Sequence, residues 1–576
     1  MEILRAENLS FRYPEADRDS LHELSFTIEE GEFVVLCGPS GSGKTTLLRH
    51  LKRELAPVGA LSGSLTYRGQ PLGELPAAVA AGEIGMVFQH PDAQIVMDTV
   101  WHELAFSMEN LGMPPAVMRT RLAEICGWFG LEPLLYQPVH ELSGGQKQLL
   151  NLASVLLLQP RVLLLDEPTS QLDPVAAREF ITALQRLNEE MSVTVMISEH
   201  RLEEVLPLAD RVLMLEGGVL QADADPRTFA GSAGGEFAAV QDYLPAAARL
   251  YLSLAPEAAS AASGTIPLTV REGRRWLHSL AEGTDAAVSG DETGLLFAER
   301  AAPHVRRQSR QESAPASAAA APASALLTCR ELTFRYAKEE REVLKKLSLT
   351  LQQGEFLAVM GGNGAGKSTL LHVLSGLLKP QRGKVELAKG MKTALLAQNP
   401  LLYFSHDTVA EELQHMAGYA GLTPGEAERE IGALLDVFRL REVLDSHPHD
   451  LSGGQQQQAA LAMMMLLKPD ILLLDEPTKG LDPAAKDRLA ALLQELRRQG
   501  ASILLVTHDV EFAARHVTRC ALLFDGGITA EGAPEGFFSS NYFYTTAVNR
   551  MVRDRLPQAL TTEDVMKAWP ASAYRS

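Results

Sequence analysis

Five short motifs occur twice in this chain of 576 residues, in the same order each time. Each set opens with a glycine-rich run, which is Gly38-Pro39-Ser40-Gly41-Ser42-Gly43-Lys44-Thr45 in the first set and Gly361-Gly362-Asn363-Gly364-Ala365-Gly366-Lys367-Ser368 in the second. A glutamine, a Leu-Ser-Gly-Gly-Gln run, an apolar segment ending in Asp-Glu-Pro, and a histidine follow in both. One core cannot hold a chain of this length, so the repeat predicts two copies of one nucleotide-handling domain.

The two copies keep a constant register through most of their length. Three pairs of equivalent residues are 309 positions apart, namely Gln89 and Gln398, Ser143 and Ser452, and Asp166 and Asp475. The lysines of the glycine-rich runs are 323 apart, so the first copy has 14 more residues between its first two motifs. These residues fall in a Gly- and Pro-containing stretch over 56–83, which predicts loops and short strands.

The patterning of each copy is typical of an α/β fold. Nearly unbroken apolar runs, such as those at 162–165, 193–197 and 503–506, suit parallel strands that are buried on both faces. After the first glycine-rich run, leucines recur at helical spacing at positions 47, 51 and 55. We therefore expect parallel strands that alternate with helices in both copies.

Composition changes between the copies, and this sets the domain boundaries. Residues 313–325 are only Ser, Ala and Pro, which cannot offset the entropy of ordering, so a flexible linker is expected. A poorly patterned helix is the alternative. The predicted divisions are a first domain over 1–235, its C-terminal extension over 236–283, a linker over 284–325, a second domain over 326–540 and its extension over 541–576. Each extension contains a threonine helix cap with an acidic first turn, at 266–272 and at 556–564.

Charge and cysteine content narrow the function classes. The chain has 53 basic and 72 acidic residues, a net charge of −19, which disfavours nucleic acid as a partner because phosphate backbones are bound by Lys and Arg. The four cysteines lack metal-ligand spacing, which favours reduced thiols in the cytosol. The start has no secretory signal, and the most apolar segment, over 149–165, is interrupted by polar residues. Any membrane function therefore requires another chain.

The glycine-rich runs predict phosphate-binding loops. Glycines let the backbone approach phosphates, and the helix that follows directs free N–H groups at them. Lys44 and Lys367 are expected to reach the β- and γ-phosphates of ATP, while Thr45 and Ser368 are expected to bind Mg²⁺. Thr46 and Thr369, which follow Thr45 and Ser368 in the sequence, are also predicted to bind ATP.

Two apolar strands each end in a pair of adjacent carboxylates. A buried strand rarely ends in this way unless the carboxylates bind a cation or transfer a proton. Asp166 and Asp475 suit the Mg²⁺ shell, and Glu167 and Glu476 suit the general base that orients the attacking water. Four further residues are predicted to be catalytic from their place in the motif order: Gln89, Gln398, His200 and His508. The two glutamines are also predicted to bind the metal. Tyr13 and Tyr336 offer aromatic faces for adenine, and for the neighbouring Phe11 and Phe334 a core or edge-strand role is the alternative.

The runs Leu142-Ser143-Gly144-Gly145-Gln146 and Leu451-Ser452-Gly453-Gly454-Gln455 resemble the signature motif of ABC-type ATPases. The resemblance covers roughly 1–235 and 326–540. It implies an α/β fold with two tandem P-loop NTPase domains, each with a mainly parallel core sheet, an antiparallel β subdomain and a helical subdomain. It also implies that the two domains pair head to tail within the chain. A signature from one domain then closes the nucleotide held by the phosphate loop of the other.

By that resemblance, two complete ATP sites form. Site one joins the first set of motif residues to Ser452, Gly453 and Gly454, and site two joins the second set to Ser143, Gly144 and Gly145; Gln146 and Gln455 complete the signatures. Asp173 and Asp482, in Leu-Asp-Pro turns, are expected to cross the interface. Neither site lacks a motif, so both are expected to hydrolyse ATP.

A narrower match concerns 87–114, which begins Val87-Phe88-Gln89-His90-Pro91-Asp92-Ala93-Gln94-Ile95. This segment is similar to the energy-coupling factor subgroup, which imports vitamins and transition-metal ions. The resemblance implies a peripheral subunit at the cytoplasmic face of the cell membrane, partnered by a transmembrane coupling protein and a small substrate-binding membrane protein. The second half lacks equivalents of Asp92 and Gln94, so the halves are expected to meet different helices of the coupling protein. Asp92 is a candidate acceptor for an arginine there, or else a solvated loop residue.

Two other classes remain open. One is a twin ATPase that serves importers of sugars or peptides, against which the segment 87–114 argues. The other is a soluble twin ATPase that acts on ribosomes or DNA, although the long charged arm and the zinc cysteines of such relatives are absent from this sequence. The transported molecule is not encoded here, and a thiamine-type precursor is suggested only by the fused form.

Overall fold

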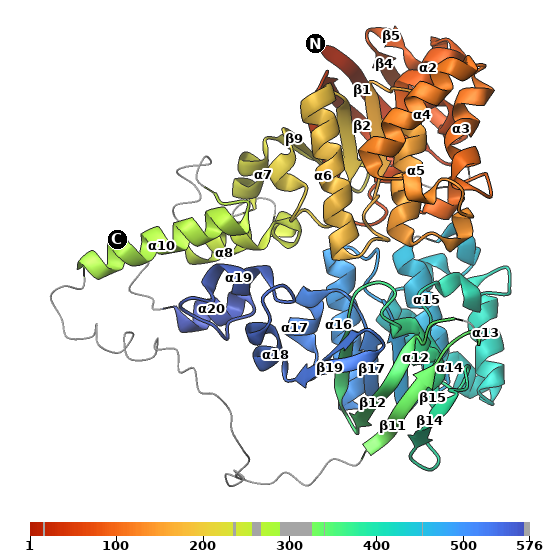
Figure 1. Cartoon of the computed structure of the whole chain (residues 1–576), viewed down its shortest axis with the longest axis vertical. Coiled ribbons are helices and arrows are strands. Elements are labelled where there is room, and N and C mark those ends of the chain that lie inside the picture. The colour runs from red at the N-terminus through yellow and green to blue at the C-terminus, as the bar shows by residue number, and fades with distance from the viewer. Residues whose placement is uncertain are drawn as a thin grey trace.

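The computed structural model describes residues 1–14, 16, 18–233, 238–255, 266–287, 325–338, 340–451 and 453–569, with side chains omitted at 238, 239 and 281–287. Figure 1 shows the first half (residues 1–287), red to yellow-green, above the second half (residues 325–569), green to blue. Each half contains its own core sheet with helices around it. The predicted fold class is therefore confirmed.

The core sheet of the first half has six strands in the order β10-β9-β3-β8-β7-β6. All neighbours are parallel except β9 and β10. Every residue of the central strands is buried, which explains their unbroken apolar sequences. The strands are β3 (Phe33–Cys37), β6 (Ile84–Val87), β7 (Val162–Asp166), β8 (Thr194–Ser198), β9 (Arg211–Glu216) and β10 (Val219–Ala224).

A second, antiparallel sheet lies beside this core, in the order β2-β1-β4-β5. Its strands are β1 (Glu2–Arg12), β2 (Leu21–Glu29), β4 (Ala60–Tyr67) and β5 (Gln70–Pro71). Alternating burial along β1 and β2 leaves one face of this sheet on the core and the other in solvent. The helices of the first half are α1 (Lys44–Leu51), α2 (Ala77–Glu83), α3 (Val100–Asn110), α4 (Pro115–Phe129), α5 (Gly144–Leu156), α6 (Pro174–Met191), α7 (Pro226–Ser232), α8 (Ala246–Leu254) and α10 (Val270–Ala287).

The second half repeats this plan with sheets β15-β16-β17-β13-β18-β19 and β12-β11-β14. Its strands are β11 (Ala325–Phe334), β12 (Leu344–Gln352), β13 (Phe356–Met360), β14 (Arg382–Leu387), β15 (Thr393–Leu396), β16 (Ile471–Asp475), β17 (Ser502–Val506), β18 (Arg519–Phe524) and β19 (Gly527–Gly532). Its helices are α12 (Lys367–Leu374), α13 (Val409–Tyr419), α14 (Pro424–Phe438), α15 (Gly453–Leu466), α16 (Pro483–Arg498), α17 (Val510–His516), α18 (Pro534–Ser540), α19 (Ala547–Val552) and α20 (Thr562–Ala568).

The extra residues of the first half form β5 and α2, between β4 and β6. The second half passes from β14 to β15 without either element. The sequence predicted loops and short strands here, and it missed the helix α2. Because the insertion lies at an edge of the antiparallel sheet, it leaves the strands of the core sheet in register.

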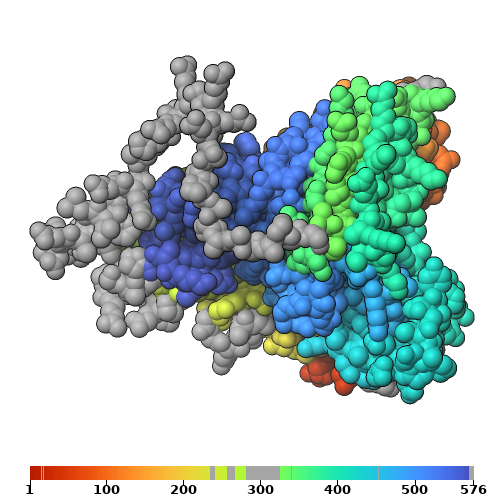
Figure 2. Space-filling view, turned by 90° about the horizontal axis from the view of Figure 1, so that it is seen from below, coloured from red at the N-terminus to blue at the C-terminus, as the bar shows by residue number. Residues whose placement is uncertain are grey.

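The two C-terminal extensions pack on each other and join the halves. Buried residues of α8 and α10 form one apolar cluster with residues of α19 and α20, among them Leu250, Leu277, Met551 and Val565. Figure 1 shows these four helices side by side, and Figure 2 shows yellow residues of the first half beside the dark blue C-terminal residues. The helix α10 runs to Ala287, past residue 284 where the predicted linker begins. Most of that predicted linker, 288–324, lies outside the described residues.

The predicted helix caps in the extensions are confirmed. Thr269 Oγ1 accepts the N–H of Glu272, and the Glu272 carboxylate accepts the N–H of Leu268. Thr561 and Asp564 form the same reciprocal box at the start of α20. Among the described residues, no helix has the length and apolar content needed to cross a membrane.

Candidate nucleotide sites

Both predicted phosphate loops lie where a central parallel strand ends and a helix begins. The first loop joins β3 to α1, and the second joins β13 to α12. Gly43 and Gly366, which precede the lysines, have φ angles of 98° and 101°. A Cβ on Gly38 would fall 1.9 Å from the carbonyl oxygen of Leu215, so that position requires glycine. The carboxyl ends of parallel strands are where α/β folds bind ligands.

The lysines of the two loops are buried and bonded within their own loops. Lys44 Nζ donates to the carbonyls of Gly38 and Pro39 at 2.9 and 3.0 Å, and Lys367 Nζ donates to those of Gly361 and Gly362 at 2.9 and 3.1 Å. Burial lowers the pKa of Lys44, against the pull of Glu167 and Asp166. Each ammonium group therefore lies inside the curve of its loop, where a phosphate would enter.

The carboxylates of the first half lie beside this loop. Thr45 Oγ1 donates to Asp166 Oδ1 at 3.1 Å, and Ser198 Oγ donates to the same atom at 2.9 Å. Burial raises the pKa of Asp166, and the adjacent Glu167 raises it further. In the second half, burial likewise raises the pKa of Asp475, although the Ser368 hydroxyl works against it.

Each glutamate that follows is held by the late histidine. Glu167 Oε1 lies 2.8 Å from His200 Nε2, and Glu476 Oε2 lies 2.8 Å from His508 Nδ1. Burial would raise the pKa of both carboxyls, but the histidines and the loop lysines outweigh it, so both pKa values are lowered. Both glutamates also have positive φ angles, 43° and 50°, an uncommon backbone state for a non-glycine residue.

Several buried polar atoms at these sites lack a hydrogen-bond partner. The second ring nitrogens, His200 Nδ1 and His508 Nε2, have none, and neither do Ser42 Oγ and Asp475 Oδ1. Buried polar groups are almost always paired. A free serine hydroxyl and free ring nitrogens beside a phosphate loop fit phosphate oxygens, and a free carboxylate oxygen fits a cation bound with them.

The two glutamines differ. Gln89 Nε2 donates to Glu167 Oε2 at 2.8 Å, so the first site holds its glutamate from two sides. Gln398 is exposed, and no hydrogen bond to Glu476 is recorded for it. The structure therefore brings the predicted glutamine to the carboxylate in the first half and not in the second.

The predicted adenine tyrosines lie next to the phosphate-loop helices. Tyr13 Oη is 3.2 Å from Thr46 Oγ1, and Tyr336 Oη is 3.0 Å from Thr369 Oγ1. Phe11 and Phe334 are buried and contact these tyrosines edge to face. The phenylalanines thus have the core role, while Tyr336 keeps 59% of its side chain exposed.

The signature run of the first half starts a helix. Ser143 caps α5, accepting the N–H of Gln146, and the Gln146 side chain accepts the N–H of Ser143. Gly144 is exposed at this N-terminus, whereas Gly145 is buried. In the second half α15 begins at Gly453, and the predicted ATP ligand Ser452 lies outside the described residues.

One predicted crossing between the halves is present. Asp482 of the second half accepts the N–H of Ser40, in the first phosphate loop, at 2.9 Å. Its other oxygen caps α16 through the N–H of Ala485. The equivalent Asp173 accepts from Val175 and Ala176 of its own helix, rather than from across the interface.

In the segment after each glutamine, a side chain forms the same two hydrogen bonds to the backbone, but the residue type differs between the halves. Gln94 accepts the N–H of Phe88 and donates to the carbonyl of Met86. In the second half, Tyr403 Oη accepts the N–H of Ala397 and donates to the carbonyl of Leu395, the equivalent two groups. The missing glutamine noted in the sequence is thus replaced by a tyrosine with the same bonding role.

Asp92 has no such replacement. Its side chain is 74% exposed, and its Oδ1 lies 2.6 Å from Lys147 Nζ, on the signature helix α5. The equivalent residues of the second half are Leu401 and Gln456. The ion pair is therefore a feature of the first half alone.

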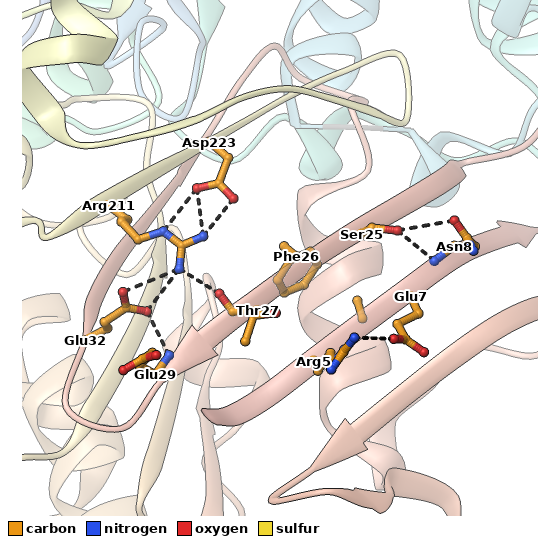
Figure 3. Close-up of a pocket in the computed structure, with 11 residues that line it drawn as sticks. Arg5, Glu7, Asn8, Ser25, Phe26, Thr27, Glu29, Glu32, Arg211 and Asp223 are labelled. Atoms are coloured by element: carbon orange, nitrogen blue, oxygen red, sulfur yellow. Dashed lines mark hydrogen bonds and ion pairs between the residues drawn. The ribbon is translucent and has the colours of Figure 1, made fainter. Parts of the chain in front are cut away.

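A large pocket lies away from these residues, against β1 and β2. Figure 3 shows Arg211 bonded to both Asp223 and Glu32 on one side of it. The second half repeats this network with Arg519, Glu355 and Glu531. Because it recurs in both halves and joins the antiparallel sheet to the core sheet, we assign it a structural role.

Two site residues escaped the sequence analysis. Ser198 directly follows the apolar run at 193–197, and its hydroxyl donates to Asp166. Glu199 accepts the N–H and the hydroxyl of Thr169 at 3.1 and 2.6 Å, and burial raises its pKa to about 7. The signal that could have found Glu199 is a carboxylate next to the motif histidine, where the second half has Thr507.

Comparison with known proteins gives consistent matches. The family described as ABC transporter matches residues 21–170 and 344–479. A protein of Bacillus thuringiensis described as an ABC transporter ATP-binding protein is 42% identical over 581 residues, covering 99% of this chain and 98% of its own. One of Streptomyces coelicolor with the same description is 36% identical, covering 98% and 100%.

Two further matches carry more specific descriptions. YkoD of Bacillus subtilis, described as an HMP/thiamine import ATP-binding protein, is 30% identical and covers 93% of both chains. The solved structure of cbiO1 from Clostridium perfringens, described as part of the complex cbiONQ, is 30% identical and covers 39% of this chain and 90% of its own, with a TM-score of 0.37.

Proposed function

Because this chain belongs to the ATP-binding proteins of ABC transporters, and is an ATPase of that family, we propose that it powers uptake of a small nutrient. It would act through a separate transmembrane coupling protein and a small substrate-binding membrane protein. The nutrient class is a vitamin, a vitamin precursor or a transition-metal ion. Full-length similarity to YkoD supports a thiamine-type precursor within that class.

The contacts of the two sites support the proposed hydrolytic residues. Glu167 and Glu476 remain ionised, because their histidines keep the pKa of each carboxyl low, so each can accept a proton from an attacking water. The free nitrogens of His200 and His508 would bond a γ-phosphate oxygen. Lys44 and Lys367 would exchange their loop carbonyls for phosphate oxygens.

The residues present also fit Mg²⁺. Hydroxyl and carboxylate oxygens are the ligands that this cation prefers, and Thr45 already lies 3.1 Å from Asp166. Ser368 and Asp475 are the equivalent residues in the second half, where Asp475 Oδ1 has no partner. When bound, the cation would neutralise charge on the phosphates.

Closure of each site is proposed to use both halves. Asp482 already reaches the first phosphate loop, which supports a head-to-tail arrangement. In that arrangement Gly453, Gly454 and the undescribed Ser452 would complete the first site, and Ser143 with Gly144 and Gly145 would complete the second. The protein would act as a peripheral subunit at the cytoplasmic face of the cell membrane, where its membrane partners lie.

The observation that best supports an energy-coupling partner is the exposed loop around Asp92. It projects a carboxylate beside Lys147 on the signature helix, so an arginine of a coupling protein could bind Asp92 and reach the signature directly. The second half presents Leu401 and Gln456 there. The two halves would therefore meet chemically different segments of the coupling protein.

Co-purification with membrane proteins tests this function. The full chain would be expressed with candidate membrane partners. Detergent extracts would be assayed for association, and intact cells for uptake of labelled thiamine precursor, cobalt or nickel. We expect a stable complex that takes up one of these in an ATP-dependent manner. Asp92→Leu should weaken the complex, while Asp98→Asn, in the same segment, serves as the matched control. A chain that never binds a membrane protein would contradict the proposal.

A further inference from the structure

An ion pair joins the two halves at equivalent positions. Arg201 directly follows His200, and Asp509 directly follows His508. Arg201 Nη2 lies 3.7 Å from Asp509 Oδ2. When equivalent residues of two similarly folded, face-to-face halves touch each other, the contact lies on the pseudo-twofold axis that relates them.

Such a contact has a special property. If two copies of the first half paired, Arg201 would face Arg201, and if two copies of the second half paired, Asp509 would face Asp509. Only the pairing of unlike halves places opposite charges at the axis. We propose that Arg201 and Asp509 select pairing of the first half with the second half, and reject pairing of like halves from two chains.

The surroundings make Arg201 the stronger selector. Asp509 is 8% exposed, and it already has a cation of its own half, since Lys486 Nζ lies 2.6 Å from the same oxygen. Arg201 is 43% exposed, and Asp509 is its one recorded ion pair among the described residues. The first-half equivalent of Lys486 is Ala177. A pair of two first halves would therefore place two copies of Arg201 together. The carboxylate that pairs with Arg201 would be absent, because Asp509 belongs to the second half.

The remaining charged groups near the axis do not supply that partner. Glu199 lies two residues before Arg201, whose charge acts to lower its pKa, but no ion pair joins them and the Glu199 carboxylate is bonded to Thr169. Lys479 and Lys486, which face Arg201 from the second half, are both cations. Pairing of two second halves would place two Asp509–Lys486 pairs together, which is a smaller penalty. Since every chain supplies one half of each kind, rejection of the first pairing is sufficient to favour the mixed one.

A second inter-half ion pair agrees with this selection. Arg274 of α10 bonds Asp554, which follows α19. Matching the threonine caps of α10 and α20 makes Met566 the equivalent of Arg274, and matching the starts of α8 and α19 makes Ser253 the equivalent of Asp554. Either pairing of like halves would lose this bond. The charges at both contacts thus favour the same partner.

The test cuts the chain after it has folded. A protease site would be inserted between residues 300 and 310, and the purified full chain would be cleaved, so that pairing depends on the interface alone. Each half has apolar clusters of its own, which supports its persistence after the cut. Native mass spectrometry after equilibration separates mixed pairs from pairs of like halves, because the two fragments differ in mass.

The expected results follow the charges. The wild-type protein should give almost entirely mixed pairs, and Arg201→Gln should raise the small share of paired first halves by about tenfold or more. Asp509→Asn should release pairs of second halves to a smaller extent. Arg186→Gln, which removes a first-half arginine bonded to Glu190 of its own helix, is the matched control and should give mixed pairs alone.

Three results would contradict the selection proposal, and each points to a different explanation. If Arg201→Gln yields free halves without like pairs, the ion pair only stabilises the interface, and the selection proposal is wrong. Mixed pairs alone in both variants would also overturn it. Like pairs in the Arg186→Gln control would assign selection to net charge rather than to the axis. None of these readings depends on transport, so they stand apart from the function proposed above.

Discussion

The two halves carry the same motifs, yet their nucleotide sites are built differently. In the first, Glu167 is held by both Gln89 and His200, and a carboxylate of the other half bonds the phosphate loop. In the second, Glu476 is held by His508, while Gln398 is exposed. Identical motif letters therefore do not produce equivalent sites, because the residues around the motifs position their side chains.

Two motif neighbours show how this difference arises. Residue 199, beside the motif histidine, is a glutamate in the first half, and its equivalent is Thr507. Within the Leu-Asp-Pro turns, the side chain of Asp482 reaches across the interface and that of Asp173 does not. The first site therefore has more of its motif side chains bonded to one another than the second.

The largest effect that tests this comparison is expected at the glutamates. Glu167→Gln and Glu476→Gln should each slow hydrolysis at its own site by about 10²-fold if that residue is the general base, so turnover of the full chain should fall at least to about half. Steady-state phosphate release measures the effect, with the half-exposed Glu204→Gln as control. If one of the two substitutions leaves turnover unchanged, the sites differ in catalysis and not only in organisation.

A pH-dependent difference in stability is expected from Glu199. Burial raises its pKa from 4.5 to about 7 in the folded protein, so the folded first half binds this proton more tightly than the unfolded chain. Stability is therefore lost as pH rises from about 4.5 to 7, by roughly 3 kcal/mol at most. Glu199→Gln should remove that loss, while its amide oxygen still accepts from Thr169.

Calorimetry of the nucleotide-free protein at pH 5 and pH 8 measures this. The unfolding midpoint of the first half should rise in Glu199→Gln at pH 8 and stay near the wild-type value at pH 5. The unfolding of the second half, which has Thr507 instead, supplies an internal control. An equal effect at both pH values would rule out the proton as the cause.

Because Tyr403 bonds the backbone groups that Gln94 bonds in the first half, removing its hydroxyl should lower the free energy of unfolding by about 1–3 kcal/mol for each backbone group left unpaired. Tyr403→Phe leaves the carbonyl of Leu395 and the N–H of Ala397 without this hydroxyl, and should destabilise the second half accordingly. Tyr403→Gln restores the side-chain type of the first half and should be milder. Denaturant unfolding of the two variants ranks them, and the reverse ranking would contradict the shared role.

The smallest effect separates the two Leu-Asp-Pro aspartates. Both cap helices, so Asp173→Ala and Asp482→Ala should each cost about 1 kcal/mol of stability. Only Asp482→Ala also removes a bond to Ser40, so only that variant should weaken ATP binding at the first site. Equal affinities for a fluorescent ATP analogue in the two variants would show that the crossing has no role in binding.

Much of this architecture was predictable from the sequence. The α/β class, the repeat, the helix caps at Thr269 and Thr561 and the placement of both glycine-rich runs after buried strands followed from local patterns. The helix α2 was missed, because its short Ala-rich sequence lies among turn residues and carries no clear periodicity.

The sequence by itself determined the motifs and their order, because strand ends, loop glycines and helix caps depend on neighbouring residues. Only the tertiary structure decided that Asp482 crosses to Ser40 while its equivalent Asp173 does not, and that Arg201 meets Asp509. It also revealed that Tyr403 forms the backbone hydrogen bonds that Gln94 forms in the first half. Such contacts depend on how two folded halves and their loops pack, and residues 308 or 442 positions apart leave no local pattern of their meeting.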